Sequence, residues 1–278
     1  MRRVFLLLLA AGLFVGSVSA APQRQLIGTT QDHSLDQVGD CDNYHAAMLT
    51  SLPARVQEQE QREVSLSGID LVKVRASEEG GVSVRGWDKP GARLIICKYA
   101  VSMTKRQAKQ TLDGITVSYA GGNIEALGPE INQTQAWWAN IILYVPKSVT
   151  LDVNAENGGI AIRNMNGKVT AHATNGGISV AQCAGEHRIT TENGGISLEK
   201  ITGHLEASSE KGMIALKLRD THAIGIEARV DGGEIVCRVD QCSDGTWTAD
   251  RKILKMGNAV PSIRLSTDSA PIMIENVR

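Results

Sequence analysis

The sequence predicts an all-β fold, a β-solenoid of stacked coils with irregular terminal strands, with an up-and-down β-meander or sandwich as the alternative. Three observations lead to this prediction. An Asn-Gly-Gly turn recurs every 18 residues, at Asn157, Asn175 and Asn193. Short runs of alternating apolar and polar residues flank each turn. Aromatic residues make up only 4% of the chain, which holds 28 glycines, and this composition suits a core of layered aliphatic side chains.

Residues 1–20 have the pattern of a secretory signal peptide. Arg2 and Arg3 precede an apolar run at residues 4–15, and small residues follow it. The run is shorter than the roughly 20 residues that span a bilayer, and no later segment approaches that length. We therefore expect a mature chain that is exported to the periplasm or the cell exterior and has no transmembrane segment.

Two further regions are expected after the signal peptide. Residues 21–62 are polar and lack β alternation, which indicates a leader that is partly helical or disordered. Alternation begins at residue 63, so residues 63–278 are predicted to form a single β-repeat domain with regular coils at about residues 150–220. Inside this domain a short helix is expected at residues 105–112, stopped by Asp113 and Gly114.

The repeat itself favours the solenoid. Residues of the same kind recur at the 18-residue period, as in the inward column Ile160, Ile178 and Ile196. A second glycine column has the same period: Gly167, Gly185 and Gly203. Stacked coils turn such columns into continuous ladders. Asn-Gly between alternating runs is also a hairpin signal, and this keeps the meander open.

The turn residues are interpreted as structural. Glycine permits a positive φ and lets neighbouring coils approach closely, and asparagine tolerates the same left-handed region. A phosphate-binding role is excluded because no helix start follows the turns. The structural turn residues are Asn157, Gly158, Gly159, Asn175, Gly176, Gly177, Asn193, Gly194 and Gly195.

Several motifs together resemble a known family. They are residues 80–88, residues 144–146, the three Asn-Gly-Gly-Ile copies, and residues 265–267 running into 272–274. On these motifs the chain resembles a bacterial adhesin-like family of unknown function over roughly residues 63–278. The family pattern keeps glycine in the last turn, where this chain has Ala270 and Pro271. The resemblance implies an exported protein with a β-solenoid-like body and a role in adhesion or surface structure, and it assigns no catalytic residues.

Glu192 and Glu210 are candidate binding residues on the outward column beside the turns. Adjacent coils place them about 5 Å apart, near the carboxylate separation of retaining glycosidases. The same column also suits a bound cation or a plain solvated face, and the solvated face is the usual explanation.

Trp137 and Trp138 are the other candidate binding residues. Adjacent residues of a strand face opposite sides, so one ring is expected at the surface, where it stacks on a sugar or a partner. Trp87 is expected to be buried.

In an exported chain the five cysteines are expected to form disulfides. Cys237 and Cys242 are close enough for a local bridge. Cys41 and Cys97 are then left as a second pair that ties the leader to the body. Cys183 lies in an apolar column of the repeat and is expected to be a buried free thiol.

No catalytic apparatus is recognisable. The chain has neither a Gly-x-Ser-x-Gly elbow nor a His-Glu-x-x-His pair, and His187 stands alone in an aliphatic column. A formal net charge of −1 offers no basic field for nucleic acid. We expect no metal site, no cofactor and no enzyme activity, but a binding or scaffold role towards an envelope or surface protein or a glycan. The alternatives are a carbohydrate-active enzyme that uses Glu192 and Glu210, and a periplasmic partner that senses the envelope.

Overall fold

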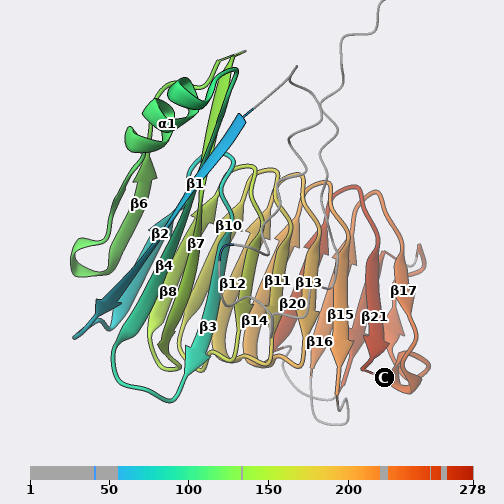
Figure 1. The fold of residues 1–278 in the computed structure, drawn as a ribbon. Helices are drawn as coiled ribbons and strands as arrows, with labels where there is room; N and C mark the ends of the chain where they lie inside the picture. Colours follow the sequence, from blue (N-terminus) through green and yellow to red (C-terminus); the bar gives the residue numbers. More distant parts are fainter. Residues whose placement is uncertain are drawn as a thin grey trace, which may run out of the picture.

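The computed structural model describes residue 41 and residues 56–132, 134–219, 225–250, 252–257 and 262–277. The predicted signal peptide lies outside these residues, as does most of the predicted leader. Figure 1 shows an elongated stack of strands with the helix α1 near one end. The strands form two sheets, one of 10 strands and one of 11.

The helices and strands follow one another along the chain in a fixed order. They are β1 (Val56–Leu66), β2 (Leu71–Arg75), β3 (Val82–Trp87), β4 (Ala92–Ser102), α1 (Lys105–Asp113), β5 (Thr116–Ser118), η4 (Ala120–Gly122), β6 (Asn123–Leu127), β7 (Gln135–Pro146), β8 (Thr150–Ala155), β9 (Ile160–Arg163), β10 (Val169–Ala173), β11 (Ile178–Ala181), β12 (Ala184–Thr191), β13 (Ile196–Glu199), β14 (Thr202–Ser209), β15 (Ile214–Leu218), β16 (Ile226–Val230), β17 (Ile235–Cys237), η5 (Asp240–Cys242), β18 (Thr246–Trp247), β19 (Ile253–Met256), β20 (Ile263–Thr267) and β21 (Ile272–Asn276).

The regular coils stack in parallel with no shift in register. Strand β11 pairs in parallel with β9 and β13, so that Ile178 lies between Ile160 and Ile196. Strand β10 pairs in the same way with β8 and β12 on the other sheet. The 18-residue period is therefore one coil, and the solenoid prediction is confirmed. The meander alternative is wrong, because consecutive strands of a meander pair antiparallel.

Of the two reasons expected for the turn glycines, the structure supports the close approach of neighbouring coils and not the positive φ. No asparagine or glycine of the Asn-Gly-Gly turns is among the described residues with a positive φ. The first glycine of each turn instead lies against the coil below: a Cβ on Gly176 would be 2.0 Å from the carbonyl oxygen of Gly158. The left-handed conformation occurs at the opposite corner of the coil, at Asn164, Gln182 and Lys200. Close approach, not backbone freedom, therefore explains the glycine.

The two sheets enclose one aliphatic core that runs along the stack from Val72 to Ile274. Beside the turns this core contains the buried hydroxyls of Thr191 and Ser209. The backbone amide of Gly194 donates to Thr191 Oγ1 (3.0 Å), and that of Gly212 donates to Ser209 Oγ (2.8 Å). Each hydroxyl thus accepts a hydrogen bond from an amide of its own turn. This bond offsets the free-energy cost of burying the hydroxyl.

The N-terminal end departs from the coil pattern. Strand β1 pairs antiparallel with β4, and β4 pairs antiparallel with β7. Residues 56–62, expected in the leader, belong to β1 and extend the sheet by a mostly exposed edge strand. Their sequence lacks apolar alternation because neither face of this part of the strand lies in the central core. The helix is confirmed: α1 begins after the N-cap Thr104 and ends before Gly114.

The C-terminal end also differs from a simple stack. Strands β20 and β21, the last in the sequence, lie between two coils formed earlier in the chain. On one sheet β20 pairs with β14 and β16, and on the other β21 pairs with β15 and β17. The last two strands in the sequence are therefore an internal layer of the stack.

Candidate functional site

The Asn-Gly-Gly turns of successive coils lie one above another and form a ridge along one edge of the stack. Glu192 and Glu210 lie on neighbouring coils of this ridge, as expected: the amide of Glu210 donates to Thr191 O (3.2 Å), and that of Lys211 donates to Glu192 O (2.9 Å). Glu192 is half-buried and Glu210 is exposed. The described residues contain no group of three or more carboxylate, histidine or cysteine side chains able to hold a metal ion.

Asparagine side chains connect successive coils of the ridge. Asn175 Nδ2 donates to Asn157 Oδ1 (2.7 Å), and Asn193 Nδ2 donates to Asn175 Oδ1 (2.8 Å). Asn157 Nδ2 continues the series to Glu79 Oε1 (3.2 Å). The asparagines of the repeat therefore form a ladder that fixes the register of the turns, as amide ladders do in stacked strands.

Trp137 and Trp138 are both buried, with 7% and 4% of their surface exposed. The prediction that one ring is exposed is wrong, because each face of β7 is covered there. Trp137 lies in a cluster with Leu112 of α1, and its Nε1 donates to Pro129 O (2.6 Å). Trp138 stacks on Tyr99 at 5.2 Å in the cluster that contains Cys41. Trp87 is half-buried.

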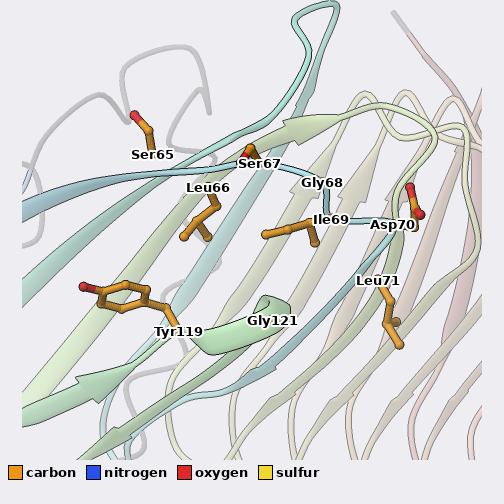
Figure 2. A pocket seen from close by; sticks show the side chains of 9 residues that line it. All are labelled: Ser65, Leu66, Ser67, Gly68, Ile69, Asp70, Leu71, Tyr119 and Gly121. Atoms are coloured by element: carbon orange, nitrogen blue, oxygen red, sulfur yellow. The ribbon is translucent and has the colours of Figure 1, made fainter.

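A cavity of about 320 Å³ lies at the N-terminal end, between the loop joining β1 to β2 and the segment after β5. We call it the N-terminal mouth and define it by Leu66, Ile69, Leu71 and Tyr119. Leu71 is 42% exposed, whereas Leu66, Ile69 and Tyr119 are partly buried against the central core. In Figure 2 the side chains of Leu66 and Ile69 lie on the side of the loop that faces Tyr119. The mouth is thus an opening of mixed polar and apolar lining that lies beside the end of the core.

Arg62 contacts Tyr119, one of the residues that line the mouth. Its Nη2 donates to Tyr119 Oη (3.1 Å), and its guanidinium carbon lies 5.6 Å from the centre of the ring. Arg62 is on β1, the edge of one sheet, and Tyr119 follows β5, the edge of the other. The pair therefore connects the two sheet edges across the open end of the core.

Glycine brings the two walls of the mouth together. A Cβ on Gly122 would lie 2.4 Å from Leu71 O, and its φ of +80° also favours glycine. The mouth was missed in the sequence because its walls come from distant segments that carry no recognisable motif. The Gly121 and Gly122 pair was the one local signal of a close approach.

One protein-family model matches the part of the sequence that forms the two long sheets and their in-register coils. A family model described as Toastrack DUF4097 matches residues 72–275, which is most of the chain. The chain belongs to this family. The Toastrack match begins in β2 and ends in β21, so it spans all the stacked coils.

Solved structures similar to this Toastrack chain include a "putative adhesin" from Bacteroides fragilis, with 12% identity, a TM-score of 0.40, and coverage of 79% of this chain and 97% of that one. Another is a "putative cell adhesion protein" from Clostridium sporogenes, with 10% identity, a TM-score of 0.35, and coverage of 80% and 100%. No curated protein matches the chain.

Both disulfides suggested by the sequence are present in the Toastrack chain. Cys41 is bonded to Cys97, and Cys237 is bonded to Cys242. Tyr99 Oη also donates to Cys41 O (2.5 Å), which adds a second attachment at this point. Cys183 is a buried free thiol, as expected, and burial raises its pKa to about 11.

His187 is an unusual element of the Toastrack core. It lies between Val169 and Leu205 of the adjacent strands, it is 1% exposed, and neither ring nitrogen has a hydrogen-bond partner. Burial lowers the pKa of its imidazole, and the neighbouring carboxylate of Glu186 partly offsets this. The side chain is therefore held neutral in an aliphatic ladder.

Within the parts of the chain that the structure describes, no helix is both long enough and apolar enough to cross a membrane.

Proposed function

We propose that this Toastrack chain is an exported, non-catalytic protein of the cell envelope or surface that serves as a binding or scaffold domain. One observation carries the proposal: disulfides occur at both ends of the stack, Cys41–Cys97 at the N-terminal end and Cys237–Cys242 at the C-terminal end. Disulfides persist in the periplasm and outside the cell and are rare in the cytosol. The signal-peptide pattern of residues 1–20 supports the same compartment.

The architecture supports binding or scaffolding. In-register coils present their side chains in straight columns, and stacked repeats are widely used as extended binding surfaces. The N-terminal mouth adds a cavity to this surface. The partner class is an envelope or surface protein or a glycan.

Cell fractionation tests export. The protein is expected in the periplasmic or extracellular fraction, with an intact mass that lacks residues 1–20 and with four of its cysteines oxidised. Recovery of the full-length, fully reduced chain from the cytosol would contradict the proposal.

A binding screen beside a turnover assay tests the binding role. The purified exported protein is applied to a glycan array and to purified envelope proteins, and is incubated separately with envelope polysaccharides. We expect binding without turnover, and we expect the double variant Glu192→Gln and Glu210→Gln to bind as the wild type does. Turnover that this variant loses would overturn the proposal and identify a carbohydrate-active enzyme.

A further inference from the structure

Strand β1 is a long edge strand with a partner on one side only. Its 11 residues all pair antiparallel with β4, and β1 ends the ten-stranded sheet. Figure 1 shows it near the end of the stack that carries α1. The backbone N–H and C=O groups that point away from β4 therefore have no strand partner in the described part of the chain. Such an edge is a template for another strand.

Most of the devices that protect a sheet edge are absent from β1. Edge strands are commonly short, bulged or interrupted by proline. Strand β1 contains no proline, and its pairing with β4 runs from Val56 to Leu66 without a bulge. Helix α1 reaches the start of the strand, where Lys105 pairs with Glu58 at 3.8 Å, but residues 59–63 are all exposed. The middle of this edge is therefore accessible.

The charges of β1 are its remaining protection, and they decide which strand can pair with it. In an antiparallel pair, opposite charges directly across from each other stabilise the pairing, whereas like charges destabilise it. Strand β1 complements itself: when a second copy is centred on Gln61, Arg62 lies across from Glu60 of that copy. Val56 and Leu66 then lie across from each other at both ends, so all 11 residues are paired.

The neighbouring registers place like charges together. A centre at Glu60 or at Arg62 sets that side chain across from its own copy. A centre at Gln59 sets Glu58 across from Glu60. The register centred on Gln61 is the one of these four that sets no like charges across from each other, so cross-strand electrostatics favours it.

The side chains of Glu60 and Arg62 are available to a second copy. Both are exposed. Arg62 uses Nη2 to donate to Tyr119 Oη, which leaves its other N–H groups, and no ion pair joins it to a carboxylate among the residues that the structure describes. Glu60 Oε1 lies 3.1 Å from Lys98 Nζ, which leaves Oε2 as an acceptor.

We infer that β1 is a surface for self-association. Two copies of the chain pair antiparallel through their β1 strands about a two-fold axis at Gln61, and their two ten-stranded sheets become one. The contact runs along a single strand from each copy, so the dimer is expected to be transient. Self-association goes beyond the proposed binding function, and a chain that stays monomeric would leave that function intact.

Sedimentation-velocity ultracentrifugation of the purified exported protein tests the inference. The fraction of dimer should increase between about 1 µM and about 100 µM protein, as expected for a small interface. Arg62→Glu makes both central charge pairs repulsive and should weaken dimerisation about tenfold or more. The matched control is Arg229→Glu, the same charge reversal at an exposed position on β16 of the other sheet, and it should dimerise as the wild type does.

A second variant, Glu60→Arg, tests the register. Alone it should also dimerise about tenfold more weakly or worse, because each central pair would join two basic side chains. An equimolar mixture of Glu60→Arg and Arg62→Glu should form a heterodimer as readily as the wild type forms its dimer. In that mixture every central pair joins an acidic side chain of one variant to a basic side chain of the other.

Circular dichroism checks that each variant is folded before sedimentation. Glu60→Arg removes the partner of Lys98, and if this variant does not fold, the salt dependence decides instead. Higher NaCl should weaken the wild-type dimer, whose central pairs attract, and strengthen that of Arg62→Glu, whose central pairs repel.

Four results overturn the inference. They are a wild type that stays monomeric at about 100 µM, unchanged dimerisation of Arg62→Glu, folded variants that form no heterodimer when mixed, and the same direction of salt dependence for wild type and Arg62→Glu. The first result would leave the edge of β1 to a strand of another protein.

Discussion

The position of a Cβ on Gly176 would be 2.0 Å from the carbonyl oxygen of Gly158 on the preceding coil, whereas a Cβ on Gly177 would be 3.4 Å from Gly195 O. The two glycines are adjacent in the sequence but have different surroundings. The first is packed against backbone that cannot move without separating the coils, and the second borders a space that accepts a methyl group.

Alanine substitutions are therefore expected to have unequal effects at these two positions. Gly176→Ala should destabilise the protein by about 3 kcal/mol or prevent folding, because the clash is with backbone. Gly177→Ala should change the free energy of unfolding by less than about 1 kcal/mol. Chemical denaturation followed by circular dichroism measures both. Equal effects would contradict the close-approach explanation of the turn glycines.

The asparagine ladder predicts losses of stability that depend on how many of its hydrogen bonds a substitution removes. Asn175→Ala removes two side-chain hydrogen bonds, to Asn157 and from Asn193, whereas Asn193→Ala removes the single bond to Asn175. At about 1 kcal/mol for each bond, the first substitution should cost about 2 kcal/mol and the second about 1 kcal/mol. Chemical denaturation followed by circular dichroism measures both losses. Thr174→Ala, beside the ladder, is the control and should have little effect.

Buried His187 predicts a dependence of stability on pH. Its pKa in the folded state is lowered from the unfolded value of about 6.5, because burial disfavours the charged imidazole. Above about pH 6.5 both states are neutral, so this site causes no pH dependence. As the pH falls below that value the unfolded state takes up the proton first, and stability falls by up to about 1.4 kcal/mol per pH unit until the folded state is protonated as well.

His187→Leu should remove this dependence. The variant should be more stable than the wild type at pH 8, by about 1–3 kcal/mol, because it removes two buried nitrogens without partners. The difference should be larger at pH 5. Thermal unfolding at both pH values measures it, with the half-exposed His204→Leu as control. Parallel pH profiles for wild type and His187→Leu would argue against this role of His187.

Cys183 should be unreactive in the folded protein. A buried thiol with a pKa of about 11 carries little thiolate at pH 8. Iodoacetamide should leave the native protein unmodified, modify one cysteine after denaturation without reduction, and modify all five after reduction. Intact mass and peptide mapping would record this. A bridged Cys183 would contradict the disulfide assignment.

The repeated coils could be predicted because residues of the same kind recur every 18 positions. Identical residues at 18-residue spacing, such as Ile160 and Ile178, favoured stacked coils but left a meander open, and the parallel pairing of the strands decides for the coils. The function of the first turn glycine was not predictable in detail. A sequence shows that glycine is required but not whether the reason is φ or a neighbouring backbone.

The N-terminal end was less predictable. Residues 56–61 form a strand because β4 offers them a pairing edge, and their own glutamine-rich sequence has no apolar alternation to indicate it. The prediction that one of the rings of Trp137 and Trp138 is exposed was wrong because the alternation of a strand shows which residues face opposite sides but not what covers each side. The mouth joins Leu66 to Tyr119 through tertiary packing, which local patterns do not contain.

The position of β20 and β21 between layers that precede them in the chain has a consequence for biosynthesis. These two strands are translated after β16 and β17, so the neighbours of β16 and β17 are complete only when β21 has left the ribosome. A chain that stops before β20 leaves two apolar coil faces without the layer that separates them. The core can therefore close only after β20 and β21 have been synthesised, and a chain that lacks them cannot complete its fold.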